Sequence, residues 1–231
     1  MKLIKDFIKN NKEVYYILFF PLYILSFFII EYITPTSGYW VTDCILDIYI
    51  PFVPEFIFSY IFWFPLFPIV GFPLLFKDID AFSRWMRYLI FSLSSCMIFY
   101  YFVPNGQHLR PESIVADSLA TELLTLIWSV DTPTNVFPSM HVVVCIGNIC
   151  AIIDSKAAFK NRAIRLILMI STALCASSTV FIKQHGIMDT FGAVTLAVPF
   201  ILIIYGKRIM GEKKNRPPVL SSRFNPAEGL S

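Results

Sequence analysis

A histidine and an aspartate lie four residues apart in the stretch STVFIKQHGIMD, residues 178–189. If a helix begins near this point, His185 and Asp189 share one face, and the carboxylate can accept a hydrogen bond from one imidazole nitrogen. The other nitrogen is then free to act as a base or a nucleophile, because the carboxylate fixes the tautomer and stabilises an imidazolium. An ordinary hydrogen bond at a membrane surface is the alternative interpretation of the same spacing.

A second histidine lies in the stretch NVFPSMHV, residues 135–142, directly before an apolar run. Pro138 and Ser139 predict the start of a helix, with Ser139 as its N-cap. The unpaired amides of a first helical turn attract anions, and His141 is expected in that turn. A capped helix with no further role is the alternative.

An arginine follows a turn in the stretch PNGQHLRPES, residues 104–113. The residues Pro104, Asn105 and Gly106 predict the turn. Arg110 has a planar guanidinium that suits two parallel hydrogen bonds to a phosphate, although it could instead be an anchor at the membrane surface. Together the three stretches supply a cation, a helix N-terminus, two imidazoles and a carboxylate. This set predicts an anionic substrate, and phosphate fits best.

The composition indicates that these stretches belong to an integral membrane protein. The 231 residues have a mean hydropathy of +0.65, and 56% are hydrophobic while only 15% are charged. Such a chain is too apolar for an ordinary soluble domain. The five cysteines show no C-x-x-C spacing, so neither a zinc site nor a disulfide framework is supported. The basic N-terminus continues into an apolar run without a small-residue cleavage site, which predicts a retained first span.

The apolar runs predict an all-α fold, a polytopic bundle of six transmembrane helices. A helix of about 20 residues crosses the hydrocarbon core of a bilayer, and that length divides the chain. The predicted spans are 14–33, 56–76, 84–103, 140–158, 163–182 and 187–205. The fourth is the weakest, because its strictly apolar stretch ends at Asp154.

Some segments outside the spans are expected to be structured and others disordered. Residues 1–13 are predicted to be a cytoplasmic N-terminus, 14–205 the membrane domain and 206–231 a disordered cytoplasmic tail. Residues 113–131 are too polar to span and predict an interfacial amphipathic helix, either a connector or a border of a lipid entrance. Its expected apolar face consists of Val115, Leu119, Leu123 and Ile127.

The basic residues predict how the chain is oriented. Of the 19 Lys and Arg residues, 17 lie before the first span, in 77–87, in 154–165 or in the tail, and these segments are therefore expected to be cytoplasmic. Both termini are then inside. Arg110 and Lys183 are the two cations left on the outer side, and all three histidines also fall there. Ionisable groups at membrane depth are costly unless they are used, so we expect one site at the outer face.

These residues give the chain a family resemblance. It resembles the type 2 phosphatidic acid phosphatases, the integral-membrane lipid phosphate phosphatases and their phosphotransferase relatives. The family pattern is Lys-x6-Arg-Pro, then Pro-Ser-Gly-His, then Ser-Arg-x5-His-x3-Asp. This chain has Arg110-Pro111, then Pro138-Ser139-Met140-His141, then Ser178-Thr179 followed after five residues by His185 and after three more by Asp189. The match covers roughly residues 84–205, and its specificity comes from the conjunction of short motifs.

The resemblance implies a covalent mechanism. His185 would attack phosphorus and form a phosphohistidine, with Asp189 orienting its ring. His141 would protonate the leaving oxygen and later activate water, while Arg110 and Ser139 would bind phosphate oxygens. No metal or other cofactor is required in this chemistry. The implied partners are a phospholipid or lipid phosphate and the membrane, and no nucleic acid is expected.

Two cations of the family pattern are missing here. The lysine position falls on Val103, and the arginine after Ser178 is Thr179. Lys183, Gln184, His108 or Asn105 could compensate, with Lys183 the first choice because it is the other outer cation.

The missing cations leave two reactions open. A poorer cation cluster suits a phosphodiester, so a transferase resembling inositol-phosphorylceramide or sphingomyelin synthases stands beside the hydrolase, with a lipid hydroxyl in place of water. A transporter is the alternative from another class. It is disfavoured because no charged residue or histidine lies near the centre of a predicted span.

Overall fold

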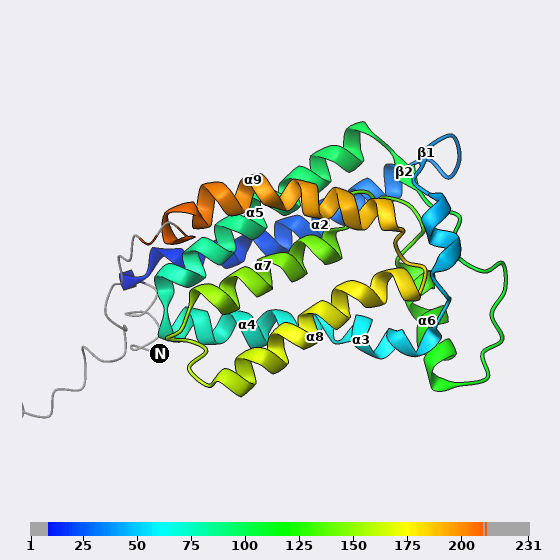
Figure 1. Ribbon diagram of the computed structural model, residues 1–231. Helices are drawn as coiled ribbons and strands as arrows, with labels where there is room; N and C mark the ends of the chain where they lie inside the picture. Colours follow the sequence, from blue (N-terminus) through cyan, green and yellow to red (C-terminus); the bar gives the residue numbers. More distant parts are fainter. Residues whose placement is uncertain (1–8, 210, 212–231) are drawn as a thin grey trace, which may run out of the picture.

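A computed structural model describes residues 9–209 and 211, and this part of the chain is almost entirely helical (Figure 1). The short strands β1 (Trp40–Val41) and β2 (Asn105–Gly106) pair in parallel and join two loops. The helical elements are the 3₁₀ segments η1 (Lys12–Leu18), η2 (Ile45–Tyr49) and η3 (Pro54–Phe56) and the α-helices α2 (Phe19–Ile33), α3 (Ile57–Ile61), α4 (Trp63–Lys77), α5 (Ile79–Phe102), α6 (Leu119–Val130), α7 (Met140–Asp154), α8 (Arg162–Phe181) and α9 (Ile187–Ile209).

The predicted all-α fold is confirmed, and the predicted spans are confirmed in part. Each of the six falls on a helix or on consecutive helical segments. Among the residues that the structure describes, four segments are long and apolar enough to cross a membrane, namely Lys12–Ile33, Pro54–Lys77, Arg162–Phe181 and Ile187–Arg208. The helix α7 is shorter, with 15 residues, because the apolar run stops at Asp154. The helix α5 has 24 residues but carries arginines, serines and tyrosines among its apolar side chains.

The two predicted terminal segments lie largely outside the described residues. Residues 1–8 of the N-terminal segment and, apart from Gly211, residues 210–231 of the tail are not described. The described beginning of the predicted tail is ordered, since residues 206–209 continue α9 as helix.

The helix α7 lies in the middle of the bundle and contacts α5, α8 and α9 (Figure 1). Its side chains are buried around most of its circumference, as expected for a helix that is apolar on all sides. Gly147 allows α5 to approach closely, because a Cβ atom there would lie 2.5 Å from the ring of Tyr88. The Tyr88 hydroxyl also donates to the carbonyl of Val143 at 3.1 Å. These contacts fix the position of α7 and, with it, the position of His141 at its amino end.

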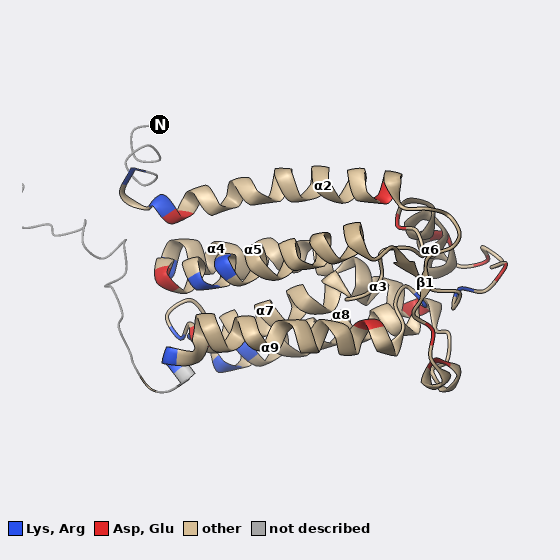
Figure 2. Ribbon diagram, turned by 90° about the horizontal axis from the view of Figure 1, so that it is seen from above, with Lys and Arg blue, Asp and Glu red and all other residues tan. Residues whose placement is uncertain are grey.

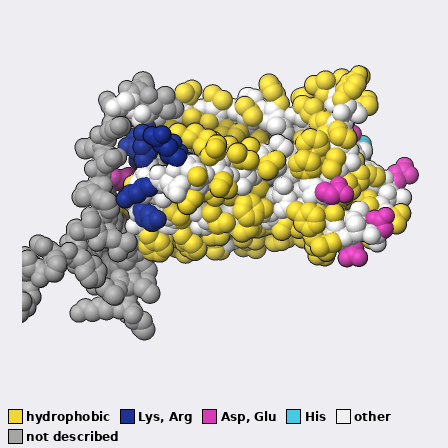
Figure 3. Space-filling model, turned by 60° about the horizontal axis from the view of Figure 1, so that its bottom comes forward, with side chains coloured by type: hydrophobic (Ala, Val, Ile, Leu, Met, Phe, Trp, Pro, Cys, Tyr) yellow, Lys and Arg dark blue, Asp and Glu magenta, His cyan; other side chains and the backbone are white. Residues whose placement is uncertain are grey.

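Charged residues separate toward the two ends of the bundle. Lys and Arg gather at one end and Asp and Glu predominate at the other (Figure 2). Between the two ends, the face seen in Figure 3 exposes mainly hydrophobic side chains. The basic end holds the segments that the sequence predicts to be cytoplasmic, and the opposite end gathers α6, the β1–β2 pair and the turn between α8 and α9. The candidate site residues lie at this second end.

The helix α6 forms within the predicted segment 113–131, and half of its expected apolar face is confirmed. Leu123 and Ile127 are half-buried and pack against the core, whereas Val115 and Leu119 are exposed. Ser118 caps the helix by accepting a hydrogen bond from the amide of Thr121, so Val115 lies before it begins. The buried side chains of α6 are Ala120, Thr121 and Leu124, and Leu119 is 62% exposed. The difference has a physical reason, because α6 packs against η3 and α3 through Ala120 and Leu124.

Candidate active site

The two histidines of the predicted site meet at the acidic end of the bundle. His141 is the second residue of α7, and His185 lies in the turn between α8 and α9. His141 Nδ1 and His185 Nε2 are 3.1 Å apart, and the residues are only 7% and 3% exposed. The rings therefore share a hydrogen bond within a buried site.

The amino end of α7 is built as the sequence predicts. The hydroxyl of Ser139 accepts a hydrogen bond from the amide of Val142 at 3.4 Å, which caps the helix. The amide of Ser139 donates to the carbonyl of Asp189 at 3.0 Å. This backbone contact ties the start of α7 to the first turn of α9 and so fixes the histidines relative to each other. Ser139 is fully buried, and its hydroxyl serves as the cap of α7.

A tight turn positions His185. The amides of Gln184 and His185 both donate to the carbonyl of Thr179, at 2.9 and 3.0 Å. Lys183 adopts a positive φ of 56°, the left-handed conformation that reverses the chain between the two helices. Thr179, which stands where the family has an arginine, thus serves the turn through its backbone, and its own hydroxyl donates to the carbonyl of Ala176 at 2.8 Å.

Two acceptors surround the second ring nitrogen of His185. Its Nδ1 lies 3.1 Å from the carbonyl of Val136 and 3.5 Å from Asp189 Oδ2. Since a carbonyl can only accept, Nδ1 carries a hydrogen, and the tautomer is fixed mainly by Val136 with the carboxylate beside it. Asp189 Oδ2 also accepts from the amide of Gly186 at 2.7 Å. The predicted His–Asp pair is therefore present, with Val136 as a partner that the sequence did not reveal.

The second nitrogen of His141 has partners that sequence reasoning missed. The hydroxyl of Tyr60, on α3, lies 2.9 Å from His141 Nε2 and donates to Asp131 Oδ2 at 2.7 Å. A continuous hydrogen-bonded row thus runs from Asp131 through Tyr60 and His141 to His185. In the sequence, Tyr60 resembles any aromatic of an apolar span. Asp131 was only the last residue of a predicted surface helix, so nothing local marked either residue.

Arg110 lies beside this row and is held by several acceptors. Its Nη2 donates to the side-chain oxygen of Gln184 at 2.6 Å and to the carbonyl of Asp131 at 2.7 Å. The guanidinium lies 5.0 Å from the centre of the Trp128 ring. Burial lowers the pKa of Arg110 to about 10, so the group stays charged at neutral pH. Its buried Nε has no hydrogen-bond partner within the described chain and remains available to a ligand.

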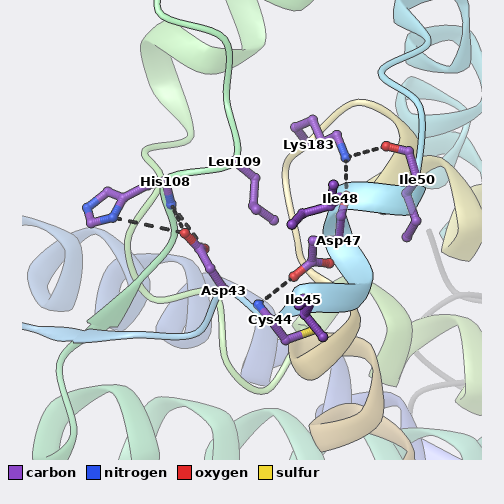
Figure 4. A pocket seen from close by; sticks show the side chains of 9 residues that line it. All are labelled: Asp43, Cys44, Ile45, Asp47, Ile48, Ile50, His108, Leu109 and Lys183. Carbon is purple, nitrogen blue, oxygen red and sulfur yellow. Dashed lines mark hydrogen bonds and ion pairs between the residues drawn. The ribbon is translucent and has the colours of Figure 1, made fainter.

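Lys183 points away from the histidines. Its ammonium donates to the carbonyls of Asp47 and Ile50, at 3.1 and 2.7 Å. There it lines an open pocket of about 580 Å³ next to the site, together with Asp43, Cys44, Ile45, Ile48, His108 and Leu109 (Figure 4). His108 is also remote from the rings, since its amide donates to Asp43 and its Nε2 lies 3.3 Å from the Tyr39 hydroxyl. Neither basic side chain joins the histidine row.

Asn105 uses its whole side chain to shape the loop before α7. Its amide oxygen accepts from the amides of Val136 and Phe137, at 2.9 and 2.7 Å. Its amide nitrogen donates to the carbonyls of Val103 and Phe137, at 2.8 and 3.2 Å. Asn105 therefore places the Val136 carbonyl against His185 and has no donor left for a phosphate.

The site brings together two imidazoles, two carboxyl groups and one guanidinium, from His141, His185, Asp131, Asp189 and Arg110. Among residues 9–209 and 211, no group of three His, Cys, Asp or Glu residues could hold a metal ion.

No protein-family model, curated protein or solved structure matches the chain. The geometry supplies a buried imidazole with a fixed tautomer, a second imidazole in contact with it and a charged guanidinium nearby. Such a set can perform nucleophilic and acid–base catalysis on an anion.

Proposed function

We propose that this protein is an integral-membrane lipid phosphatase, which hydrolyses the phosphate ester of a lipid through a phosphohistidine on His185 and needs no metal. The observation that carries this proposal is the 3.1 Å contact between His141 Nδ1 and His185 Nε2. Two imidazoles from separate segments of the chain, buried together and each held at its second nitrogen, are what nucleophilic attack with acid–base assistance requires.

Each residue then has a role set by its position. His185 Nε2 attacks phosphorus, and the Val136 carbonyl and Asp189 hold the hydrogen on Nδ1. His141 donates a proton to the leaving oxygen and later takes one from water. Reacting atoms approach to about 3–3.5 Å before transfer, so a phosphoryl group does not fit between nitrogens that are already 3.1 Å apart. Substrate binding must therefore part the two rings.

The membrane arrangement of this proposal uses all six helical segments. The four candidate spans cross the bilayer, and α5 and α7 cross with them, because α7 is enclosed by its neighbours and needs no lipid-facing surface of its own. The basic end faces the cytoplasm with both termini, following the distribution of Lys and Arg. The site then faces outside, with α6 at the outer surface.

A head-group phosphotransferase is the second candidate, and one observation favours it. Arg110 is the one Lys or Arg side chain that reaches the histidine row in the described chain, since Lys183 is turned toward Asp47 and Ile50. A single cation is better matched to a phosphodiester, with one negative charge, than to a monoester with nearly two. The same residues would then transfer the phosphoryl group to a lipid hydroxyl.

An activity screen tests both candidates. Purified protein is incubated in EDTA with a panel of lipid phosphates and head-grouped phospholipids, and inorganic phosphate and new lipids are measured. We expect turnover that His185→Ala lowers by on the order of 10⁴-fold or more, because a nucleophile is lost. His108→Ala is the matched control, since this exposed histidine lies outside the row.

The products separate the candidates. Release of inorganic phosphate supports the phosphatase, whereas a new head-grouped lipid without phosphate release supports the transferase. Absence of turnover, or turnover that His185→Ala leaves unchanged, contradicts both.

A further inference from the structure

The hydrogen-bonded row from Asp131 to His185 has more contacts than the hydrogens of Tyr60 and of two neutral histidines can supply. Four contacts follow one another: Asp131 to Tyr60, Tyr60 to His141, His141 to His185, and His185 to the carbonyl of Val136. Each contact needs one hydrogen. One phenol and two neutral imidazoles bring three. The row therefore holds a fourth proton, on Asp131, on His141 or on His185.

The three positions of this proton differ in what they leave on the rings. A proton on His141 creates a buried imidazolium that the Tyr60 phenol separates from an ionised Asp131. Separated charges in buried surroundings are unfavourable. A proton on His185 creates an imidazolium beside Asp189, at 3.5 Å, but removes the Nε2 lone pair that the proposed attack needs.

A proton on Asp131 leaves both rings neutral. Every donor then points one way along the row. The protonated carboxyl donates to Tyr60, the reverse of the bond that Tyr60 donates to an ionised Asp131, Tyr60 donates to His141 Nε2, and His141 Nδ1 donates to His185 Nε2.

We propose, on the basis of the proposed function, that Asp131 stores the proton used by His141 and that Tyr60 relays it. During attack, the bond from His185 Nε2 to phosphorus forms and the bond from phosphorus to the leaving oxygen breaks. The leaving oxygen takes the proton of His141 Nδ1, His141 Nε2 takes the proton of Tyr60, and Tyr60 takes the proton of Asp131. Asp131 becomes a carboxylate, and His141 stays neutral but changes its tautomer.

The second half of the reaction reverses these transfers. Water, or a lipid hydroxyl, attacks the phosphohistidine and gives its proton to His141 Nδ1. The Nε2 proton then returns through Tyr60 to Asp131. The row ends each cycle as it began, and His141 is never an imidazolium. The phosphorylated ring of His185 is cationic while its Nδ1 keeps the hydrogen, and the Asp189 carboxylate lies 3.5 Å from that nitrogen. Tyr60 and Asp131 are positioning residues in this scheme, because they act on the substrate through His141.

The surroundings of Asp131 favour a protonated carboxyl group. Burial raises the pKa of Asp131, and this outweighs the hydrogen bond from Tyr60 and the nearby His185 and Arg110, which lower it. Arg110 bonds to the backbone carbonyl of Asp131, and within the described chain no Lys or Arg forms an ion pair with its carboxylate. The other titratable groups within electrostatic range are Glu31, Tyr23 and Tyr100.

The kinetic test uses two synthetic esters with different leaving groups. A nitrophenyl phosphate monoester leaves without a proton, whereas an alkyl phosphate needs one. With Tyr60→Phe or Asp131→Asn, we expect the first turnover of the nitrophenyl ester to stay within about twofold of wild type. Phosphoenzyme formation from the alkyl ester should fall by about 100-fold, the usual range for lost acid catalysis. Steady-state turnover of the nitrophenyl ester should also slow, leaving a burst, because water attack needs the same relay.

A matched variant and a spectroscopic measurement complete the test. Tyr39→Phe removes the hydroxyl of another Tyr–His pair, 3.3 Å from His108 Nε2, and should behave as wild type. Difference infrared spectra of wild type minus Asp131→Asn at neutral pH should show the carbonyl stretch of a carboxylic acid, and Tyr60→Phe should shift that band without removing it.

The outcomes distinguish the relay from the proposed function. Equal slowing of the two esters in Tyr60→Phe, or no slowing of either, overturns the relay although the enzyme is active. Absence of the carboxylic acid band overturns the stored proton. If wild type forms no phosphoenzyme from either ester, the proposed function fails, and the infrared band alone then decides where the proton lies.

Discussion

The helix α7 carries a buried titratable group at each end, and the two ends are built differently. At the carboxyl end, Asp154 pairs with Arg84 at 2.6 Å and with Arg208 at 2.8 Å. At the amino end, His141 belongs to a row of groups without a matching ion pair of Lys or Arg in the described chain. The buried carboxylate at the carboxyl end is paired with opposite charges, whereas the groups at the amino end have no such ion pair in the described chain.

Unpaired polar atoms follow the same division. Of the six buried side-chain nitrogen and oxygen atoms without a partner in the described residues, four lie around the amino end of α7, on Trp63, Arg110, Trp128 and Asp189. Buried polar groups are normally satisfied because leaving them unpaired is unfavourable. Under the proposed function, the paired carboxyl end of α7 serves stability, and the unpaired atoms around its amino end are where a ligand would bind.

The largest expected effect on stability concerns the carboxyl end of α7. Asp154→Asn removes the ion pairs that the Asp154 carboxylate forms with Arg84 and Arg208, and breaking buried pairs in this way should lower the free energy of unfolding by about 3 kcal/mol. The apparent melting temperature should fall by about 6–12 °C. Turnover per folded molecule should stay at the wild-type level, in contrast to the loss of activity at His185→Ala.

A surface substitution provides the control for this prediction. Glu122→Gln alters an exposed acidic residue of α6 and should change stability by less than about 0.5 kcal/mol. If Asp154→Asn abolished turnover without unfolding the protein, the division between the two ends of α7 would be wrong.

A smaller effect is expected from glycines at the two ends of α9. A Cβ atom at Gly192 would lie 2.4 Å from the Phe137 ring, next to the Val136 carbonyl that orients His185, whereas nothing lies within 4 Å at Gly206. Gly192→Ala should lower stability by about 1–3 kcal/mol, and the displaced loop should reduce turnover by about tenfold or more. Gly206→Ala should be neutral or stabilising by about 0.4–1 kcal/mol. Thermal unfolding and turnover of both variants test this, and equal turnover would contradict it.

The smallest effect concerns Lys183. Because its ammonium bonds to the carbonyls of Asp47 and Ile50, Lys183→Met should lower stability by about 1 kcal/mol. The same change should leave kcat/KM within about threefold of wild type, because the ammonium is bound to backbone carbonyls and not to the phosphate. Loss of a hydrogen bond to the phosphate would lower kcat/KM by more than this factor. Kinetics of Lys183→Met beside Arg110→Met test this directly. Equal losses in the two variants would place Lys183 among the phosphate ligands, as its charge alone predicts.

The elements of the fold could be predicted from local patterns, whereas the prediction that the histidines meet rests on their expected placement at one membrane face and on the family resemblance. The apolar runs predict the helices, because every buried helix needs such a run, and Pro-Ser before His141 predicts the start of α7. Asp189 four residues after His185 predicts a carboxylate beside that ring, and the structure places it 3.5 Å away. These features depend on neighbours in sequence or on a short motif.

The features that sequence reasoning missed depend on contacts between distant segments. Tyr60 reaches His141 and Asp131 across separations of 81 and 71 residues, and no local pattern distinguishes it from a core aromatic. The direction of a side chain is equally hidden, as Lys183 and Asn105 show. A count of outer cations cannot reveal that one ammonium points toward backbone carbonyls, nor that one amide is consumed in shaping a loop.

The length of α7 has a consequence for how reactants arrive. Its 15 residues extend about 22 Å at 1.5 Å per residue, less than the roughly 30 Å of a bilayer's hydrocarbon core. Under the proposed function, the amino end of α7 therefore lies below the membrane surface, and the phosphorus reacts at the depth of a lipid's ester linkages. A lipid presents its phosphate there without leaving the bilayer, and a second lipid would bring its hydroxyl to the same depth, whereas water has to descend to it.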